Sequence, residues 1–167
     1  MSDLKRITTQ FIEDEDRIRL SGEVELNQTM TLWLTRRLMS RLVSHLVAWL
    51  DTQTLTQTRP EVMQEFAQGA ARASLTPQAP VQASPLDTAW LVTSVDLTSN
   101  AQVVLLTFKG AAPEQLARLS FETIQLRQWL SIVFNQYRQA EWPLDLWPDW
   151  IKGEGLGAGR QSEVFLH

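Results

Sequence analysis

Cysteine is absent from this chain of 167 residues, and histidine is nearly so, with only His45 and His167. The absence of cysteine excludes disulfide bonds, a thiolate zinc site and a cysteine nucleophile. With one internal histidine, a multi-histidine metal site within a single chain is very hard to build. We therefore expect no bound metal and no cofactor, and we identify no catalytic residue.

The sequence also lacks a long apolar run and an excess of positive charge. The first residues, 1–6, precede no apolar run, so we expect no signal peptide, no membrane span and a cytoplasmic location. The net charge of -4 and the pI near 5.2 oppose a broad phosphate-binding surface, which argues against nucleic acid as a partner. No serine or carboxylate stands at a recognisable triad spacing from histidine, which favours a non-enzymatic role while leaving an enzyme open.

What the sequence does contain is a regular series of strands that leads into a helix. Period-two alternation predicts antiparallel strands over residues 7–12, 18–26 and 29–34. From Thr35, a suitable N-cap, the apolar spacing becomes helical and continues to Leu50.

The same order recurs in the second half of the chain. Strands are predicted over residues 88–97, 103–108 and 116–121, and a helix from about Glu122 to Tyr137. A shift of about 87 residues superimposes the two units in pattern rather than in residue identity. Two interpretations stay open: an internal repeat, and an alignment that any two strand-then-helix segments of this spacing would give.

The predicted fold is α+β, with two antiparallel three-stranded units that each lead into a long amphipathic helix packed on one sheet face. The first unit, residues 1–75, also includes a short helix opened by Thr58-Arg-Pro-Glu. The second unit occupies residues 88–152. Between them, the proline-rich residues 76–87 predict an extended and mobile linker, and the glycine-rich residues 153–167 predict a flexible tail.

One candidate site is a polar edge of the first long helix. Arg37, Arg41 and His45 follow one another at four-residue steps and therefore share one side of that helix. Two guanidinium groups beside an imidazole suit an anion or an acid–base reaction. The simpler interpretation is a solvated helix flank.

Tryptophan is the compositional outlier, with seven residues. Trp142 and Trp147 each precede a proline, which predicts extended backbone, and Trp150 follows closely. These three rings suit either an aromatic platform for a ligand or a cap over the core. Trp33 and Trp49 lie inside predicted regular elements and are candidates for the core or for an interface.

The first long helix carries an apolar face that is wider than one sheet contact requires. Its residues from Leu38 to Val47 cover nearly half of the helix, so a second cover is needed. That cover is either the helix of the second unit or a partner chain. We predict the partner chain, in a homodimer with Trp33 or Trp49 near the contact.

These observations predict a small cytoplasmic, non-enzymatic protein-interaction or accessory module that self-associates. The alternative is a small-ligand-binding protein or an unrecognised enzyme. Its pocket would lie near Arg37, Arg41 and His45, or under the segment from Trp142 to Trp150.

Overall fold

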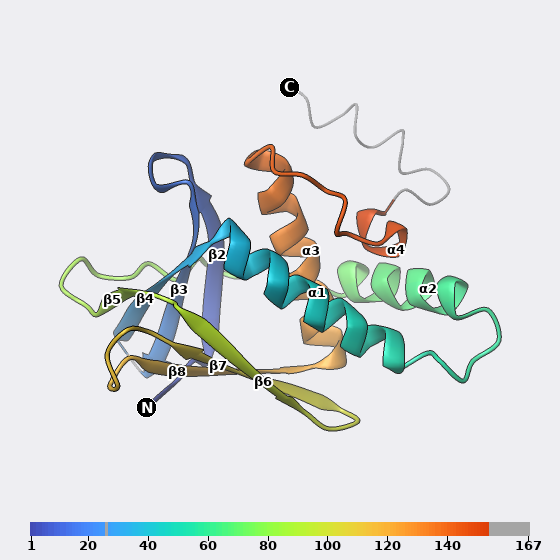
Figure 1. Cartoon of the computed structure of the whole chain (residues 1–167), viewed down its shortest axis with the longest axis horizontal. Helices are drawn as coiled ribbons and strands as arrows, with labels where there is room; N and C mark the ends of the chain where they lie inside the picture. The colour runs from blue at the N-terminus through green and yellow to red at the C-terminus, as the bar shows by residue number, and fades with distance from the viewer. Residues whose placement is uncertain (26, 154–167) are drawn as a thin grey trace.

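The computed structural model describes residues 1–25 and 27–153 and confirms the α+β class. Strands and helices gather on opposite sides of the molecule (Figure 1). The strands are β1 (Ser2–Asp3), β2 (Arg6–Ile12), β3 (Arg17–Glu25), β4 (Gln28–Thr35), β5 (Ala89–Leu91), β6 (Ser94–Ser99), β7 (Val103–Lys109) and β8 (Leu116–Glu122). The helices are α1 (Arg36–Thr52), α2 (Pro60–Ala73), α3 (Thr123–Gln139) and α4 (Asp149–Lys152), with a 3-10 turn at Glu13–Glu15.

The two sheets have the same topology. Strands β2, β3 and β4 form an antiparallel meander that leads into α1, and β6, β7 and β8 form another that leads into α3. Each sheet gains a fourth, parallel strand: β5 pairs with β4, and β1 pairs with β8. Each half of the chain therefore contributes strands to both sheets.

The chain passes from one sheet to the other at two bends. At the first bend, Leu4 N–H donates to the Arg118 carbonyl of β8, and the next residue, Lys5, donates to the Glu23 carbonyl of β3, both at 2.8 Å. Because neighbouring residues bond to different sheets, the strand pairing changes within a single step of the chain.

The second bend repeats this arrangement and corrects the strand predicted over residues 88–97. Val92 N–H donates to the Trp33 carbonyl at 2.9 Å, and Thr93 N–H donates to the Lys109 carbonyl at 2.8 Å. The alternation that predicted one strand therefore belongs to two, β5 and β6, which lie in different sheets. Sequence period alone does not reveal a change of partner.

A glycine stands beside each bend, where another side chain needs its space. A Cβ at Gly22 would lie 2.6 Å from Leu4 Cδ2, and a Cβ at Gly110 would lie 2.8 Å from Trp90 Cε3. Both distances are shorter than van der Waals contact, so the missing side chain allows Leu4 and Trp90 to enter the core.

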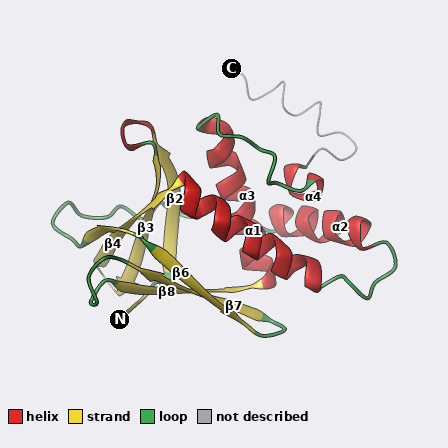
Figure 2. Ribbon diagram, viewed as in Figure 1, coloured by secondary structure: helices red, strands yellow, loops and turns green. Residues whose placement is uncertain are grey.

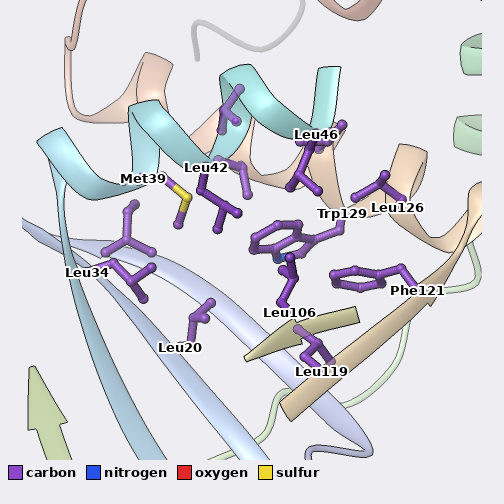
Figure 3. Packing of buried hydrophobic residues seen from close by; sticks show 14 of the residues in the cluster. Leu20, Leu34, Met39, Leu42, Leu46, Leu106, Leu119, Phe121, Leu126 and Trp129 are labelled. Atoms are coloured by element: carbon purple, nitrogen blue, oxygen red, sulfur yellow. The ribbon is translucent and has the colours of Figure 1, made fainter. Parts of the chain in front are cut away.

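The core lies between the sheets and the two long helices. α1 contacts β3 and β4, and α3 contacts β2 and β8. Figure 3 shows Trp129 of α3 in the same packed region as Leu42 and Leu46 of α1. The Ser40 and Tyr137 hydroxyls join the two helices by a hydrogen bond of 2.8 Å.

This packing removes the reason for expecting a dimer through α1. Met39, Val43, Leu46 and Leu50 are completely buried within the chain. Only Leu38 and Val47 remain partly buried on the apolar side of α1. The second cover that the wide apolar face requires is therefore intramolecular.

The proline-rich linker lies on the polar side of β2 and β4. Arg6 Nη1 donates to the Ala79 carbonyl at 2.6 Å, and Val81 N–H donates to Thr8 Oγ1 at 2.8 Å. Val81 is only 5% exposed. The linker mobility remains a prediction, and the tail beyond Gly153 lies outside the described residues.

Candidate functional site

Arg37, Arg41 and His45 lie on the solvent-exposed side of α1, as their spacing indicates. In the described part of the chain, their side chains form no hydrogen bond or ion pair, and none of them lines the hollows described below. The structure therefore brings the three side chains to one helix edge without enclosing them in a pocket.

The C-terminal tryptophans contact the body of the protein. Trp142 and Trp147 are 6% and 2% exposed, and their rings meet the Tyr137 ring edge-on at centroid distances of 5.0 and 5.2 Å. Trp150 is partly buried above the Arg127 guanidinium. Of the other two candidates, Trp49 is 9% exposed and Trp33 is partly buried.

The hydroxyl pair between α1 and α3 does not supply a general base. Burial raises the pKa of Tyr137 above its usual value of 10.0, while the hydrogen bond from Ser40 and the charge of Arg36 partly lower it. The phenol therefore stays protonated at neutral pH. We assign this pair a structural role.

α2 packs on α3 and α4 through its polar side. It lies on the side of the other helices that is remote from the sheets (Figure 2). Its Gln64 and Gln68 are 2% and 0% exposed. Pro60 lies in the first turn, as predicted, and is the first helical residue. The N-cap is Arg59 rather than Thr58, and it makes no side-chain cap bond. α2 is therefore held by its packing on α3 and α4 and not by its cap.

A buried arginine joins α2 to α3. Arg127 is only 3% exposed, and its Nη2 donates to Gln64 Oε1 at 2.5 Å. Its Nη1 lies 3.4 Å from Gln68 Oε1, and its guanidinium carbon lies 5.4 Å from the centre of the Trp150 ring. Within the described residues, no carboxylate forms an ion pair with it.

The same glutamines make further hydrogen bonds to the backbone, to a hydroxyl and, from Gln64 Nε2, to Asp51 Oδ1 at 3.3 Å. Gln64 Nε2 donates to the Leu50 carbonyl, and Gln68 Nε2 donates to the Arg127 carbonyl, both at 2.8 Å. Gln68 Nε2 also donates to Ser131 Oγ at 2.7 Å. Burial lowers the pKa of Arg127 to about 10, with a smaller opposing effect of Asp51, so the guanidinium remains charged at neutral pH.

The outer side of α2 is apolar. Val62, Met63 and Phe66 are 54%, 43% and 77% exposed. At about 100° per residue, Phe66 lies about 160° around the helix axis from each buried glutamine. Helical spacing groups these apolar residues on one face of α2, but it cannot decide which face of a helix points inward. Two features of the sequence could have indicated the orientation of α2. They are the pair Gln64 and Gln68 on one side of α2, and the single arginine, Arg127, inside the apolar stripe of α3.

A second feature, which the sequence did not reveal, is a groove of about 820 Å³ at the first bend between the sheets. Residues 4–9 form one wall, and residues 74–80 form another. β8 and the first turns of α3 form the floor. Two smaller hollows, of about 390 and 330 Å³, continue along the linker on the outer side of β3 and β4.

The described residues offer neither a metal site nor a membrane-spanning helix. They contain no group of three or more histidine, aspartate or glutamate side chains that could hold a metal ion. None of their helices has the length and apolar character needed to cross a bilayer. Comparison of the chain with protein-family models, with curated proteins and with solved structures finds no match.

Proposed function

We propose that this protein is a non-enzymatic interaction module that self-associates through the outer face of α2. The observation that carries the proposal is the inverted orientation of this helix, with Gln64 and Gln68 buried and Phe66 77% exposed. Exposed apolar residues that cluster on one helix mark an interaction surface more often than isolated ones do. This surface replaces α1 as the site of the homodimer.

A second copy fits this face because the face is complementary to itself. Its first half carries the large side chains Val62, Met63 and Phe66, and its second half carries Gly69, Ala70 and Ala73. When two α2 helices pair antiparallel, the large half of each meets the small half of the other. We place Phe66 of each chain on Ala70 of the other, which brings Met63 opposite Ala73.

Charge favours the same orientation. Glu61 and Glu65 lie in the first half of α2, and Arg72 lies in its last turn. Antiparallel pairing brings each acidic half beside the basic end of the other copy, and it also opposes the two helix dipoles. A parallel pair would place like charges beside one another.

The size of the face predicts a weak dimer. α2 has 14 residues, so it is about 21 Å long and about 10 Å across with its side chains. A single helix pair of this size falls below the roughly 1,200 Å² of buried surface that stable complexes need. We therefore expect a dissociation constant in the micromolar range or weaker, which suits a reversible accessory contact.

Two further parts of the proposal concern the origin of the two halves and the location of the protein. We infer that the halves arose by duplication, which is supported by their equal topology and by the matching hydrogen bonds at the two bends, from Lys5 N–H to the Glu23 carbonyl and from Thr93 N–H to the Lys109 carbonyl. We also infer a cytoplasmic location, which is supported by the lack of cysteine.

Sedimentation velocity tests the proposed interface. The wild-type chain should move from 19.1 kDa toward twice that mass as its concentration rises from ten to several hundred micromolar. Phe66→Glu should stay monomeric because it places a charge in the contact. Leu86→Glu is the matched control, since Leu86 is 95% exposed but lies outside α2. A wild-type chain that stays monomeric throughout, or a Phe66→Glu variant that dimerises equally, would disprove the interface.

A further inference from the structure

The groove at the first bend lies where two strands separate. Leu4 N–H makes a hydrogen bond to the Arg118 carbonyl of β8, but from Arg6 onward β2 pairs, among the described strands, with β3 alone. Beyond Arg118, β7 is the one described strand that pairs with β8. The gap between the diverging edges of β2 and β8 is the place where the groove of about 820 Å³ lies.

Buried apolar side chains form part of the floor of the groove. Leu119, Phe121 and Trp129 line it, and they are 5%, 7% and 3% exposed. The rings of Phe121 and Trp129 stack with their centroids 5.1 Å apart. The Trp129 indole N–H donates to Thr9 Oγ1 at 2.9 Å, which fixes the orientation of the ring. A ligand that binds here meets a preformed apolar surface.

The rim of the groove is polar and carries positive charge, and no carboxylate stands among the described residues that line it. Its cations are Lys5 and Arg6, and its amides include Gln125 and Gln128. Arg6 is occupied, because it donates to Glu23 Oε2 at 2.9 Å and to the Ala79 carbonyl at 2.6 Å. The exposed Lys5 forms no ion pair within the described residues, so its ammonium group is available to an anion.

From this arrangement we propose that the groove binds an amphipathic monoanion, with an apolar body on Trp129 and an acidic head at Lys5. The volume lies within the range of about 300 to 1,000 Å³ that small-molecule sites occupy. Among the described lining residues no carboxylate is present to neutralise a cationic ligand, which disfavours one. Residues 74–80 give the ligand a second wall, and they follow directly after α2, which carries the proposed interface.

The test uses decanoate and the uncharged decanol as probes, at concentrations below micelle formation. Two-dimensional NMR follows the indole N–H of Trp129, assigned through a Trp129→Phe variant, together with the backbone amides of Gln125 and Gln128. Decanoate should shift these signals saturably, and Lys5→Gln should weaken its binding about five- to tenfold through loss of a charge-assisted hydrogen bond. Lys109→Gln is the matched control, because Lys109 pairs with Asp96 and does not line the groove.

Three results would overturn the proposal. The first is the absence of any saturable shift at Trp129 up to millimolar decanoate. The second is that decanoate binds the wild-type chain and the Lys5→Gln variant with equal affinity, or that Lys5→Gln weakens the binding of decanol as much as the binding of decanoate. The third is a set of shifts confined to α2 around Phe66, which would show that the probe covers the interaction face instead. The self-association proposal does not depend on any of these outcomes.

Discussion

Replacing Gln64 by methionine should destabilise the protein by removing the acceptor nearest to a buried charge. Gln64 is 2% exposed, and its Oε1 accepts from Arg127 Nη2 at 2.5 Å. Methionine keeps the approximate length and volume of the side chain but removes the acceptor for Arg127 and the Nε2 donor to the Leu50 carbonyl and Asp51 Oδ1. The Leu50 carbonyl keeps a second donor, Gln53 N–H, at 3.1 Å.

The size of the effect follows from what Arg127 retains. A hydrogen bond to a charged group contributes about 1.5 to 3 kcal/mol, and leaving a buried charge without a partner is destabilising by about 3 to 5 kcal/mol. Arg127 still has Gln68 Oε1 at 3.4 Å and the Trp150 ring at 5.4 Å. We therefore expect Gln64→Met to lower the free energy of unfolding by about 2 to 3 kcal/mol.

A double-mutant cycle separates this interaction from simple loss of packing. Arg127→Met alone leaves the Gln64 amide oxygen without its donor, whereas Gln64→Met with Arg127→Met removes both partners. Replacing a buried polar pair by apolar side chains of similar volume is often nearly neutral. The double variant should therefore recover at least about half of the stability that the two single variants lose together.

Urea unfolding at pH 7, followed by tryptophan fluorescence, measures the free energy of unfolding of each variant in the cycle. Hydrogen exchange of the α2 amides shows whether the loss of stability is local. Gln57→Met serves as the control, because Gln57 is exposed in the loop before α2. A loss below about 0.5 kcal/mol for Gln64→Met, or strictly additive losses in the double variant, would refute the role assigned to the buried guanidinium.

Two other predictions concern a titration and a pair of glycines. Tyr137 is the only tyrosine, so phenolate absorbance reports its titration alone. Its pKa should exceed 10.0, and Ser40→Ala should raise the pKa further. The free energy of unfolding should fall above pH 10, because the unfolded chain then releases a proton that the folded chain retains. Gly22→Ala should destabilise the fold by about 1 to 3 kcal/mol, because its Cβ clashes with Leu4. The Cβ of Gly69→Ala would meet no described atom within 4 Å, so this change should stabilise a monomeric chain by up to about 1 kcal/mol. Thermal unfolding measures both changes.

The sequence predicted local structure well because period and capping are local properties. The alternation in residues 18–26 corresponds to β3, and the N-cap at Thr35 accepts a hydrogen bond from Leu38 N–H at 3.2 Å. The start of α3 at Glu122 is also correct, and a capping box there fixes it. These features depend on side chains within a few residues of one another.

The candidate site was harder to predict because it depends on contacts between distant segments. In the sequence, Arg127 only interrupts the apolar stripe of α3. Its partners Gln64 and Gln68 lie about 60 residues earlier in the chain, so the sequence does not indicate that they meet. The short β1 and the groove beside Lys5 exist only because the N-terminus pairs with β8. Such pairings are set by packing of the whole chain and leave no periodic signal.

Engineered cysteines provide the most direct test of the interface through α2, since the chain contains no cysteine of its own. If Phe66 of each copy lies on Ala70 of the other, a mixture of Met63→Cys and Ala73→Cys chains should form a disulfide-linked heterodimer under mild oxidation. Neither variant should crosslink efficiently alone, and Ala48→Cys, on the exposed side of α1, should not crosslink with either. Equal crosslinking of each variant with itself, or no heterodimer under conditions where the protein sediments as a dimer, would contradict the antiparallel pairing.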